Sequence, residues 1–297
     1  MRRFAPVVIL LLVPAAFVLA EFADTVLQAE ELHAQGKYAD AKALLLDAVA
    51  ATESGKEKAE LYWRLARETL ELGDQAEKDK KPTDAVLAYF VEGEGYADKA
   101  IAADSQNDLG YFWKSGNIGR WGQVKGVFNA LGKAPILRDL LLKVLSINPQ
   151  RSDAYFVLGQ LYREVPGWPL SFGDTDRAVS LGRLAVALNA EQVAAGTEKD
   201  ISYDFSIELA KTLKNRNWSS QNRQSEWKNK AAKYAQAATP FDKGSFYEGA
   251  NPLEDVSDKQ EAKAILTRVI ADMEALPSLK AGQVKDLQSA KDLLKSL

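Results

Sequence analysis

The chain has 297 residues, of which 46% are hydrophobic and 27% charged, and its formal net charge is −3. A chain without a concentrated basic face is not expected to bind nucleic acid. The absence of cysteine excludes disulfides and thiolate metal sites, and argues against a lipid anchor on an N-terminal cysteine. Because Ala, Leu, Lys, Glu and Asp dominate while Val, Ile and Thr are sparse, the composition predicts an all-α fold.

The first element in chain order has the features of a secretory signal peptide. Arg2 and Arg3 form a basic start, residues 4–20 carry no polar side chain, and small residues stand at the expected cleavage site. We therefore expect residues 1–20 to be a signal peptide cleaved after Ala20, and the mature chain to be periplasmic or otherwise exported. The alternative is an inner-membrane anchor over residues 4–20, although an apolar stretch that contains two prolines is short for a membrane span.

The next elements resemble tetratricopeptide (TPR) repeats, each of which is a pair of antiparallel helices. Residues 23–50 match one repeat, and Gly36 stands at its inter-helix turn, where a left-handed backbone is common. A further copy begins at residues 59–74 and continues into a long helix predicted over about residues 82–103. The spacing therefore predicts two helix pairs before residue 104.

Two more copies follow in the middle of the chain. One runs from residues 109–119 to 136–150, with an extended segment between its halves and Pro135 in the first turn of its second helix. The clearest copy covers residues 152–190, where small residues would let two helices approach closely. Its large and small positions are Tyr155, Leu158, Gly159, Tyr162, Ala178, Gly182 and Ala185.

The last part of the chain predicts a degenerate repeat and terminal helices. Residues 201–215 and 225–238 would form a fifth pair, and Ser257 with Gln260 resembles a capping box that opens a further helix. A final amphipathic helix would cover the exposed apolar end of the array. We therefore predict an all-α superhelical solenoid of about five antiparallel TPR-like helix pairs, with C-terminal capping helices, as one domain over residues 21–297.

A resemblance to a known family covers roughly residues 85–190. It rests on an aromatic helix with Tyr111 and Trp113, a glycine-rich stretch that leads to the Ile-Asn-Pro turn, and an insertion in the following repeat. These features resemble the periplasmic TPR family associated with TRAP transporters, the T component. The same helix and insertion also resemble TPR regulators of microtubule dynamics, although the signal peptide argues against that compartment.

The resemblance to the TRAP-associated family implies a non-enzymatic adaptor. Such a protein would bind a periplasmic solute-binding protein and present a small hydrophobic or acidic ligand, and a homo-oligomer is compatible with it. Members are commonly lipoproteins, from which this chain departs because it has no cysteine. The alternative function is a cell-envelope TPR scaffold for protein assembly without a role in transport.

Candidate ligand- or partner-binding residues lie on the first helices of two predicted pairs and in the insertion between residues 166 and 172. TPR register places Phe112 and the four candidates of the clearest copy on the concave face, although Phe112 and Phe156 could equally pack between helices. The other candidates between residues 113 and 121 are large amphipathic side chains beside glycines, a combination that can line a pocket. Trp168 and Phe172 are expected to fold back over the neighbouring repeat and wall a cavity. The candidates are Phe112, Trp113, Asn117, Arg120, Trp121, Asp153, Phe156, Gln160, Arg163, Trp168 and Phe172.

Catalytic chemistry has little support in the sequence. His33 is the only histidine, so a metal site built from several His or Cys residues is excluded. Asp174 and Asp176 could form an acid–base pair, but their position suits a helix N-terminus, where carboxylates meet exposed amides. We expect no enzymatic activity, no cofactor and no metal.

Overall fold

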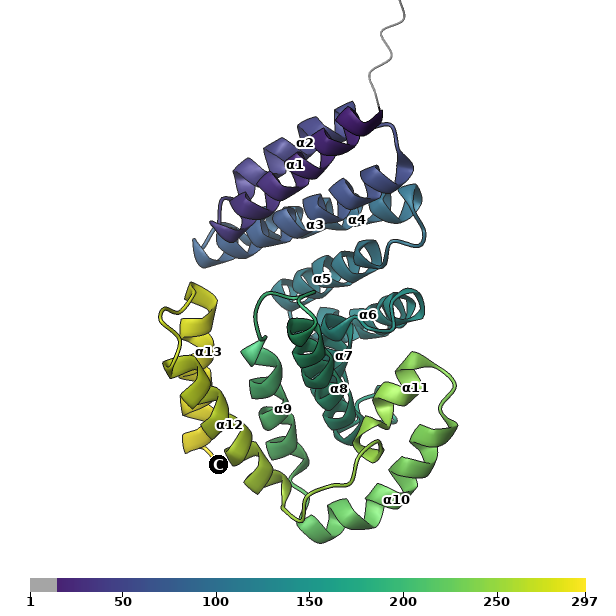
Figure 1. Cartoon of the computed structure of the whole chain (residues 1–297), viewed down its shortest axis with the longest axis vertical. Coiled ribbons are helices and arrows are strands. Elements are labelled where there is room, and N and C mark those ends of the chain that lie inside the picture. The colour runs from purple at the N-terminus through teal and green to yellow at the C-terminus, as the bar shows by residue number, and fades with distance from the viewer. Residues whose placement is uncertain (1–14) are drawn as a thin grey trace, which may run out of the picture. The chain divides into compact units, whose positions relative to one another are not determined.

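The computed structural model describes residues 15–297, and their regular structure is helical, as the composition predicts (Figure 1). The all-α fold of antiparallel helix pairs is thereby confirmed. The predicted signal peptide lies outside the described residues except for residues 15–20, where α1 begins. The described helices form two compact units, which divide between Lys125 and Gly126. The prediction of one domain over residues 21–297 stays a prediction.

The N-terminal unit contains two helix hairpins and a fifth helix. α1 pairs with α2, α3 pairs with α4, and α5 packs against both α3 and α4. Gly36 has a φ of 72°, so the left-handed turn predicted between the first two helices is confirmed. The helices are α1 (Ala15–Ala34), α2 (Tyr38–Ala51), α3 (Gly55–Lys78), α4 (Thr83–Ala103) and α5 (Asp108–Lys125).

The packing of α5 on α3 and α4 depends on one buried amide. Asn117 is completely buried, and its side-chain nitrogen donates to the carbonyl oxygens of Ala66 at 3.1 Å and Trp113 at 2.9 Å. Opposite it stands Gly93, where a Cβ atom would lie 2.0 Å from the Asn117 Oδ1 atom. The close approach of α4 and α5 therefore requires glycine at position 93.

The C-terminal unit begins with α6 and contains the clearest predicted repeat as the pair α7–α8. α9 packs against both α8 and α12, and α13 covers α9 and α12 with apolar side chains. The capping box predicted at Ser257 and Gln260 is present and opens α12. The elements are α6 (Val127–Ile147), α7 (Ser152–Glu164), α8 (Thr175–Ala194), α9 (Tyr203–Arg216), α10 (Ser220–Gln236), α11 (Pro240–Ser245), the 3₁₀ helix η1 (Tyr247–Gly249), α12 (Asp258–Glu274) and α13 (Ala281–Lys295).

The partner of α9 differs from the sequence-based prediction. α12 packs along α9, whereas α10 returns against η1, which in turn contacts α8. The reason lies in the buried faces, because α12 buries Leu266, Val269 and Met273 whereas the buried residues of α10 are Arg223 and Lys230. A helix with an ionic buried face cannot supply the apolar partner that α9 needs, so residues 220–249 form an insertion between two paired helices.

The middle of the chain is also more helical than predicted. The segment between residues 119 and 136 is not extended, because α5 continues to Lys125 and α6 begins at Val127. Pro135 lies inside α6 rather than in its first turn. Proline lacks a backbone N–H, so α6 continues past it with one fewer hydrogen bond in its ladder.

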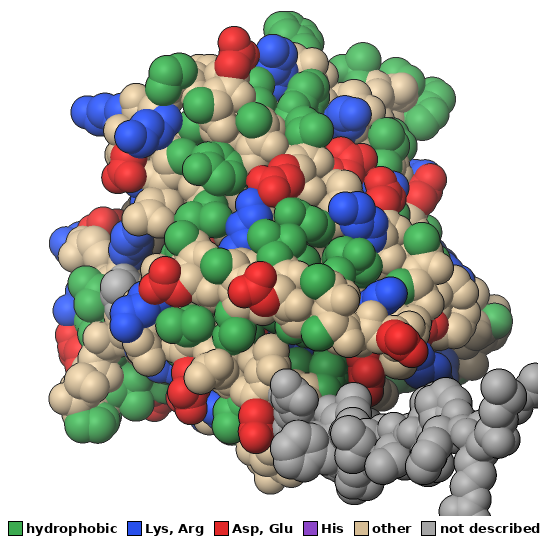
Figure 2. All heavy atoms as spheres, turned by 90° about the horizontal axis from the view of Figure 1, so that it is seen from above, with side chains coloured by type: hydrophobic (Ala, Val, Ile, Leu, Met, Phe, Trp, Pro, Cys, Tyr) green, Lys and Arg blue, Asp and Glu red, His purple; other side chains and the backbone are tan. Residues whose placement is uncertain are grey.

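The face of the molecule drawn in Figure 2 is mixed in character. Figure 2 shows acidic, basic and hydrophobic side chains interspersed over one face of the molecule, without a large area of a single charge. Between Ala15 and Leu297, no helix is long and apolar enough to cross a membrane. Among the exposed large hydrophobic residues, Phe128, Trp168 and Leu170 are the most accessible.

Gly93 and Gly95 provide a matched test of this packing within α4. Gly93→Ala should lower the free energy of unfolding by about 1–3 kcal/mol, because its methyl group would displace Asn117. Gly95→Ala meets open space and should raise stability by about 0.5–1 kcal/mol, because alanine favours the helix. Urea unfolding followed by circular dichroism measures both, and equal effects would contradict this role of Gly93.

Candidate functional site

The predicted residues of α5 are engaged in packing within the N-terminal unit. Trp113 and Trp121 lie against the buried cluster formed by Leu70, Ala76, Val86 and Phe90. The ring of Phe112 meets that of Trp113 edge-on, with 5.5 Å between the ring centroids. Asn117 makes the contacts to Ala66 and Gly93 described above. Trp113 and Trp121 therefore stabilise the helix packing, and a role of the three aromatic residues in binding stays a prediction.

Arg120 links α5 to α3 through two carboxylates. Its guanidinium donates to Asp74 at 2.7 Å and to Glu77. Burial acts to lower the pKa of Arg120, but these two carboxylates outweigh it and raise that pKa. The guanidinium is thus committed to a contact between helices.

Two of the four predicted residues on α7 also hold helices together. The ring of Phe156 stacks on that of Phe205 in α9, with centroids 4.3 Å apart and an interplanar angle of 17°. Arg163 forms ion pairs with Glu208 of α9 and with its neighbour Glu164. Asp153 and Gln160 are partly buried. The structure therefore brings the four together on one helix, but two of them face α9 rather than solvent.

Asp153 belongs to a group of carboxylates whose pKa values are raised. Burial is the main cause for Asp153, and for Asp204 of α9 burial and the charges of Asp286 and Asp153 raise the pKa to about 6. Burial also raises the pKa of Asp286. Among the described residues, no cluster of His, Cys, Asp or Glu has the arrangement of a metal site. These raised pKa values make the stability of the C-terminal unit depend on pH.

The insertion after α7 places an apolar tip in solvent. Trp168 is 90% exposed and Leu170 is 83% exposed. Phe172 does fold back, since its ring lies edge-on to Tyr162 at 5.1 Å and beneath the Arg138 guanidinium at 4.8 Å. The predicted fold-back is therefore correct for Phe172 and wrong for Trp168, and the role of Phe172 in walling a cavity stays a prediction.

The backbone holds this tip in place. The N–H of Gly173 donates to the carbonyl of Pro166 at 2.9 Å, and the N–H of Asp174 donates to that of Tyr162 at 2.8 Å. A Cβ atom at Gly173 would lie 1.9 Å from the carbonyl oxygen of Val165, so only glycine fits where the loop closes. Trp168 and Leu170 are thus exposed at the end of a closed, ordered loop.

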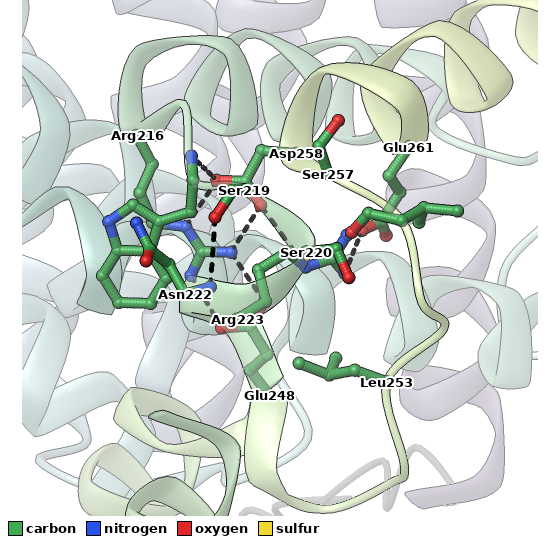
Figure 3. A network of polar contacts seen from close by, with 12 residues as sticks. Arg216, Ser219, Ser220, Asn222, Arg223, Glu248, Leu253, Ser257, Asp258 and Glu261 are labelled. Atoms are coloured by element: carbon green, nitrogen blue, oxygen red, sulfur yellow. Dashed lines mark hydrogen bonds and ion pairs between the residues drawn. The ribbon is translucent and has the colours of Figure 1, made fainter. Parts of the chain in front are cut away.

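A buried ionic cluster, which the sequence reading did not find, lies elsewhere in the C-terminal unit (Figure 3). The Arg216 side chain is 2% exposed and donates to both oxygens of Asp258 at 2.8 Å and to Glu248 at 2.7 and 2.9 Å. Burial acts to raise the pKa of Glu248, but Arg216, Arg183 and Lys230 outweigh it and hold that pKa well below its usual range. The cluster thus keeps its charges inside the protein.

Equal numbers of basic and acidic side chains make up this cluster, so it is neutral as a set. They come from α8, α9, α10, α12 and η1, and no short stretch of sequence contains enough of them to give a signal. Asp174 caps α8 as expected, whereas Asp176 pairs with Arg216 at 2.6 Å, which was not predicted. The members are Arg183, Arg216, Arg223, Lys230, Asp176, Glu248, Asp258 and Glu261.

Two adjoining cavities lie beside the cluster. One has a volume of about 350 Å³ and reaches the cluster at Arg183, Glu248 and Glu261, and the other, of about 280 Å³, is mostly apolar. Both are lined by Val186 of α8 and Leu209 of α9. The two cavities therefore adjoin at these side chains and are both lined by α8, α9 and α12, and together they are called the groove between α8 and α12.

Comparisons with known proteins find similarity to one family model and to a solved TPR structure. The family model is described as "Regulator of microtubule dynamics protein 1-3" and matches residues 25–170, a stretch that contains the Trp113 helix and Trp168. No curated protein matches the chain. A thermophilic TPR protein from Thermus thermophilus is 16% identical, with 73% of this chain and 91% of that chain covered and a TM-score of 0.48.

Removing Arg216 should strongly destabilise the C-terminal unit. Arg216→Met leaves two buried carboxylates without their main partner, so we expect a loss of about 3–5 kcal/mol in the free energy of unfolding. Arg268→Met is the matched control, because Arg268 is exposed and its ion pair with Asp272 lies on the surface. Urea unfolding measures both, and a loss no greater than that of the control would contradict this role.

Asp204 should make stability depend on pH. Its folded-state pKa of about 6 exceeds the ordinary value of 3.8. Below pH 4 the carboxyl is protonated in the folded protein and costs no stability, whereas above pH 6 it is ionised and lowers the free energy of unfolding by its full amount. Asp204→Asn removes this effect and should raise stability by about 1–2 kcal/mol at pH 7, with a smaller gain at pH 4. Thermal unfolding at both pH values measures it, and a gain that does not change with pH would contradict it.

Proposed function

We propose that this protein is a non-enzymatic adaptor that binds a partner protein through the loop of the C-terminal unit. The observation that carries the proposal is the exposure of Trp168 and Leu170 at the end of a loop closed by backbone hydrogen bonds. Tryptophan side chains often dominate binding energy when they enter a pocket on a partner. An ordered loop also loses little conformational freedom on binding.

The energetics favour contact with an apolar surface. Burying a large apolar side chain contributes about 1.5–3 kcal/mol, so covering both Trp168 and Leu170 supplies a substantial part of a moderate affinity. On the face drawn in Figure 2 the charges are mixed, and no large area of one sign is there to attract a highly charged partner. We therefore expect the partner to be recognised through shape and apolar contact rather than through charge.

We further propose export to the periplasm and a solute-binding protein of a TRAP-type transporter as the partner. The signal-like segment at residues 1–20 and the resemblance over residues 85–190 support this proposal. A small hydrophobic or acidic ligand, expected from the same resemblance, stays a prediction. A cell-envelope scaffold without a transport role is the alternative within the same compartment.

A second candidate partner follows from the family match. The model that matches residues 25–170 describes regulators of microtubule dynamics, so tubulin is the partner to compare with a solute-binding protein. The matched stretch includes Trp168 and Leu170, and the same loop would serve either partner. Co-sedimentation with microtubules separates the two proposals, since a TRAP adaptor should remain in the supernatant.

Replacing Trp168 and Leu170 at the exposed tip should strongly weaken capture of the partner without affecting the fold. We expect Trp168→Ala combined with Leu170→Ala to weaken binding about thirty-fold or more, measured against purified solute-binding proteins and microtubules. Leu27→Ala combined with Val91→Ala is the control, because both residues are exposed on the N-terminal unit. If the tip variant binds as tightly as the control, while circular dichroism shows both folded, the loop is not the docking element.

A further inference from the structure

The groove between α8 and α12 has two sections of different chemistry. The apolar section is lined mainly by aliphatic side chains from all three surrounding helices and from the loop that precedes α9, together with Tyr203 and the ion pair of Arg268 with Asp272. These apolar residues are Val186, Ala190, Ile201, Leu209, Ile265 and Val269. Its volume of about 280 Å³ is sufficient for one large apolar side chain and little more.

Polar groups for a peptide backbone lie beside this apolar section. Asn189 is buried, and its Oδ1 atom accepts the backbone N–H of Ser202 at 2.8 Å. That contact fixes the orientation of the Asn189 side-chain amide, and its nitrogen donates to no protein group among the described residues. The Ser206 side chain lines the same cavity. An amide donor and a hydroxyl next to an apolar cavity suit a backbone carbonyl and the side chain that follows it.

The second section has an excess of negative charge at its mouth. Arg183 and Arg223 line it, but both are committed to Glu248, Asp258 or Glu261 within the neutral cluster. Glu254 lines the same cavity, is exposed, and its carboxylate has no ion pair among the described residues. The uncompensated charge here is therefore that of a carboxylate.

The loop that carries Glu254 is fixed by two hydrogen bonds from α10. The indole N–H of Trp227 donates to the carbonyl of Asn251 at 2.8 Å, and the Gln224 amide donates to that of Leu253 at 3.3 Å. Glu254 is therefore held at the edge of the groove rather than on a free segment. The backbone beside Glu254 is therefore already in place before a ligand binds, which limits the loss of conformational freedom.

We propose that this groove binds an extended segment of a partner protein in which an apolar side chain stands close to a lysine or arginine. The apolar side chain enters the cavity beside Leu209, and the basic group pairs with Glu254. Because the two cavities adjoin at Val186 and Leu209, we place the two side chains two positions apart in the proposed segment, where an extended chain directs both to the same side. The inference rests on the proposed adaptor function and names a second contact on the partner.

The test uses the full chain and fluorescein-labelled synthetic peptides, with binding measured by fluorescence anisotropy. The probe is Gly-Ser-Leu-Ser-Lys-Ser-Gly, and two further probes replace its Lys by Glu or its Leu by Ser. We expect each replacement to weaken binding at least about ten-fold, which corresponds to about 1.4 kcal/mol. Equal binding of all three peptides, or no binding at about 1 mM, overturns the proposal.

Variants of the protein assign the two contacts. Glu254→Lys should reverse the preference, so that the probe with Glu binds more tightly than the probe with Lys. Ala190→Trp, at an exposed position on the edge of the apolar section, should block the probe with Leu. Asp47→Lys makes the same charge change on an exposed site of the N-terminal unit and should leave the preference unchanged. An unchanged preference in Glu254→Lys overturns the assignment.

The outcomes separate this inference from the proposed function. If the partner is captured through Trp168 and Leu170 but the peptides do not discriminate, the groove proposal is wrong and the adaptor function stands. If the peptides discriminate but no partner is captured through the tip, the groove is a binding site and the tip proposal is wrong.

Discussion

The C-terminal unit depends on the ion pairs that Arg216 makes with Asp258 and Glu248. α9 ends at Arg216, Asp258 is the first residue of α12, and Glu248 lies in η1, so one guanidinium connects both helices and the insertion between them. A buried pair of this kind adds little net stability compared with apolar packing, but losing one partner is costly. Its main effect is to fix where residues 220–249 return, and with them the loop that carries Glu254.

The two proposed contacts differ in their physics. The tip at Trp168 and Leu170 offers apolar area and no fixed partner group, so it supplies affinity with limited selectivity. The proposed groove offers a cavity beside the carboxylate of Glu254, so it would discriminate between side chains of a bound segment. Both belong to the C-terminal unit, and a partner that uses both would be selected by the groove and held by the tip.

Local sequence patterns predicted the helices well and their partners less well. The repeat spacing located α7 and α8, and Ser257 with Gln260 located the start of α12, because capping and periodicity are local signals. The pairing of α9 with α12 could not be derived from the sequence. The buried face of α10 is charged, and its ion-pair partners lie far away in the sequence. The groove was missed for the same reason, whereas the loop was found because proline and glycine mark it. Whether Trp168 is exposed depends on how the backbone closes the loop between Pro166 and Gly173, and the sequence does not reveal that geometry.

The order of the loop has a consequence for the protein on its own. A flexible segment could cover its tryptophan against the surface until a partner arrives, but a loop closed through Pro166 and Gly173 keeps Trp168 in water permanently. Molecules without a bound partner therefore expose an apolar surface at Trp168 and Leu170. We expect self-association or adsorption to rise with the amount of unpartnered protein, so balanced production of the two partners would matter to the cell.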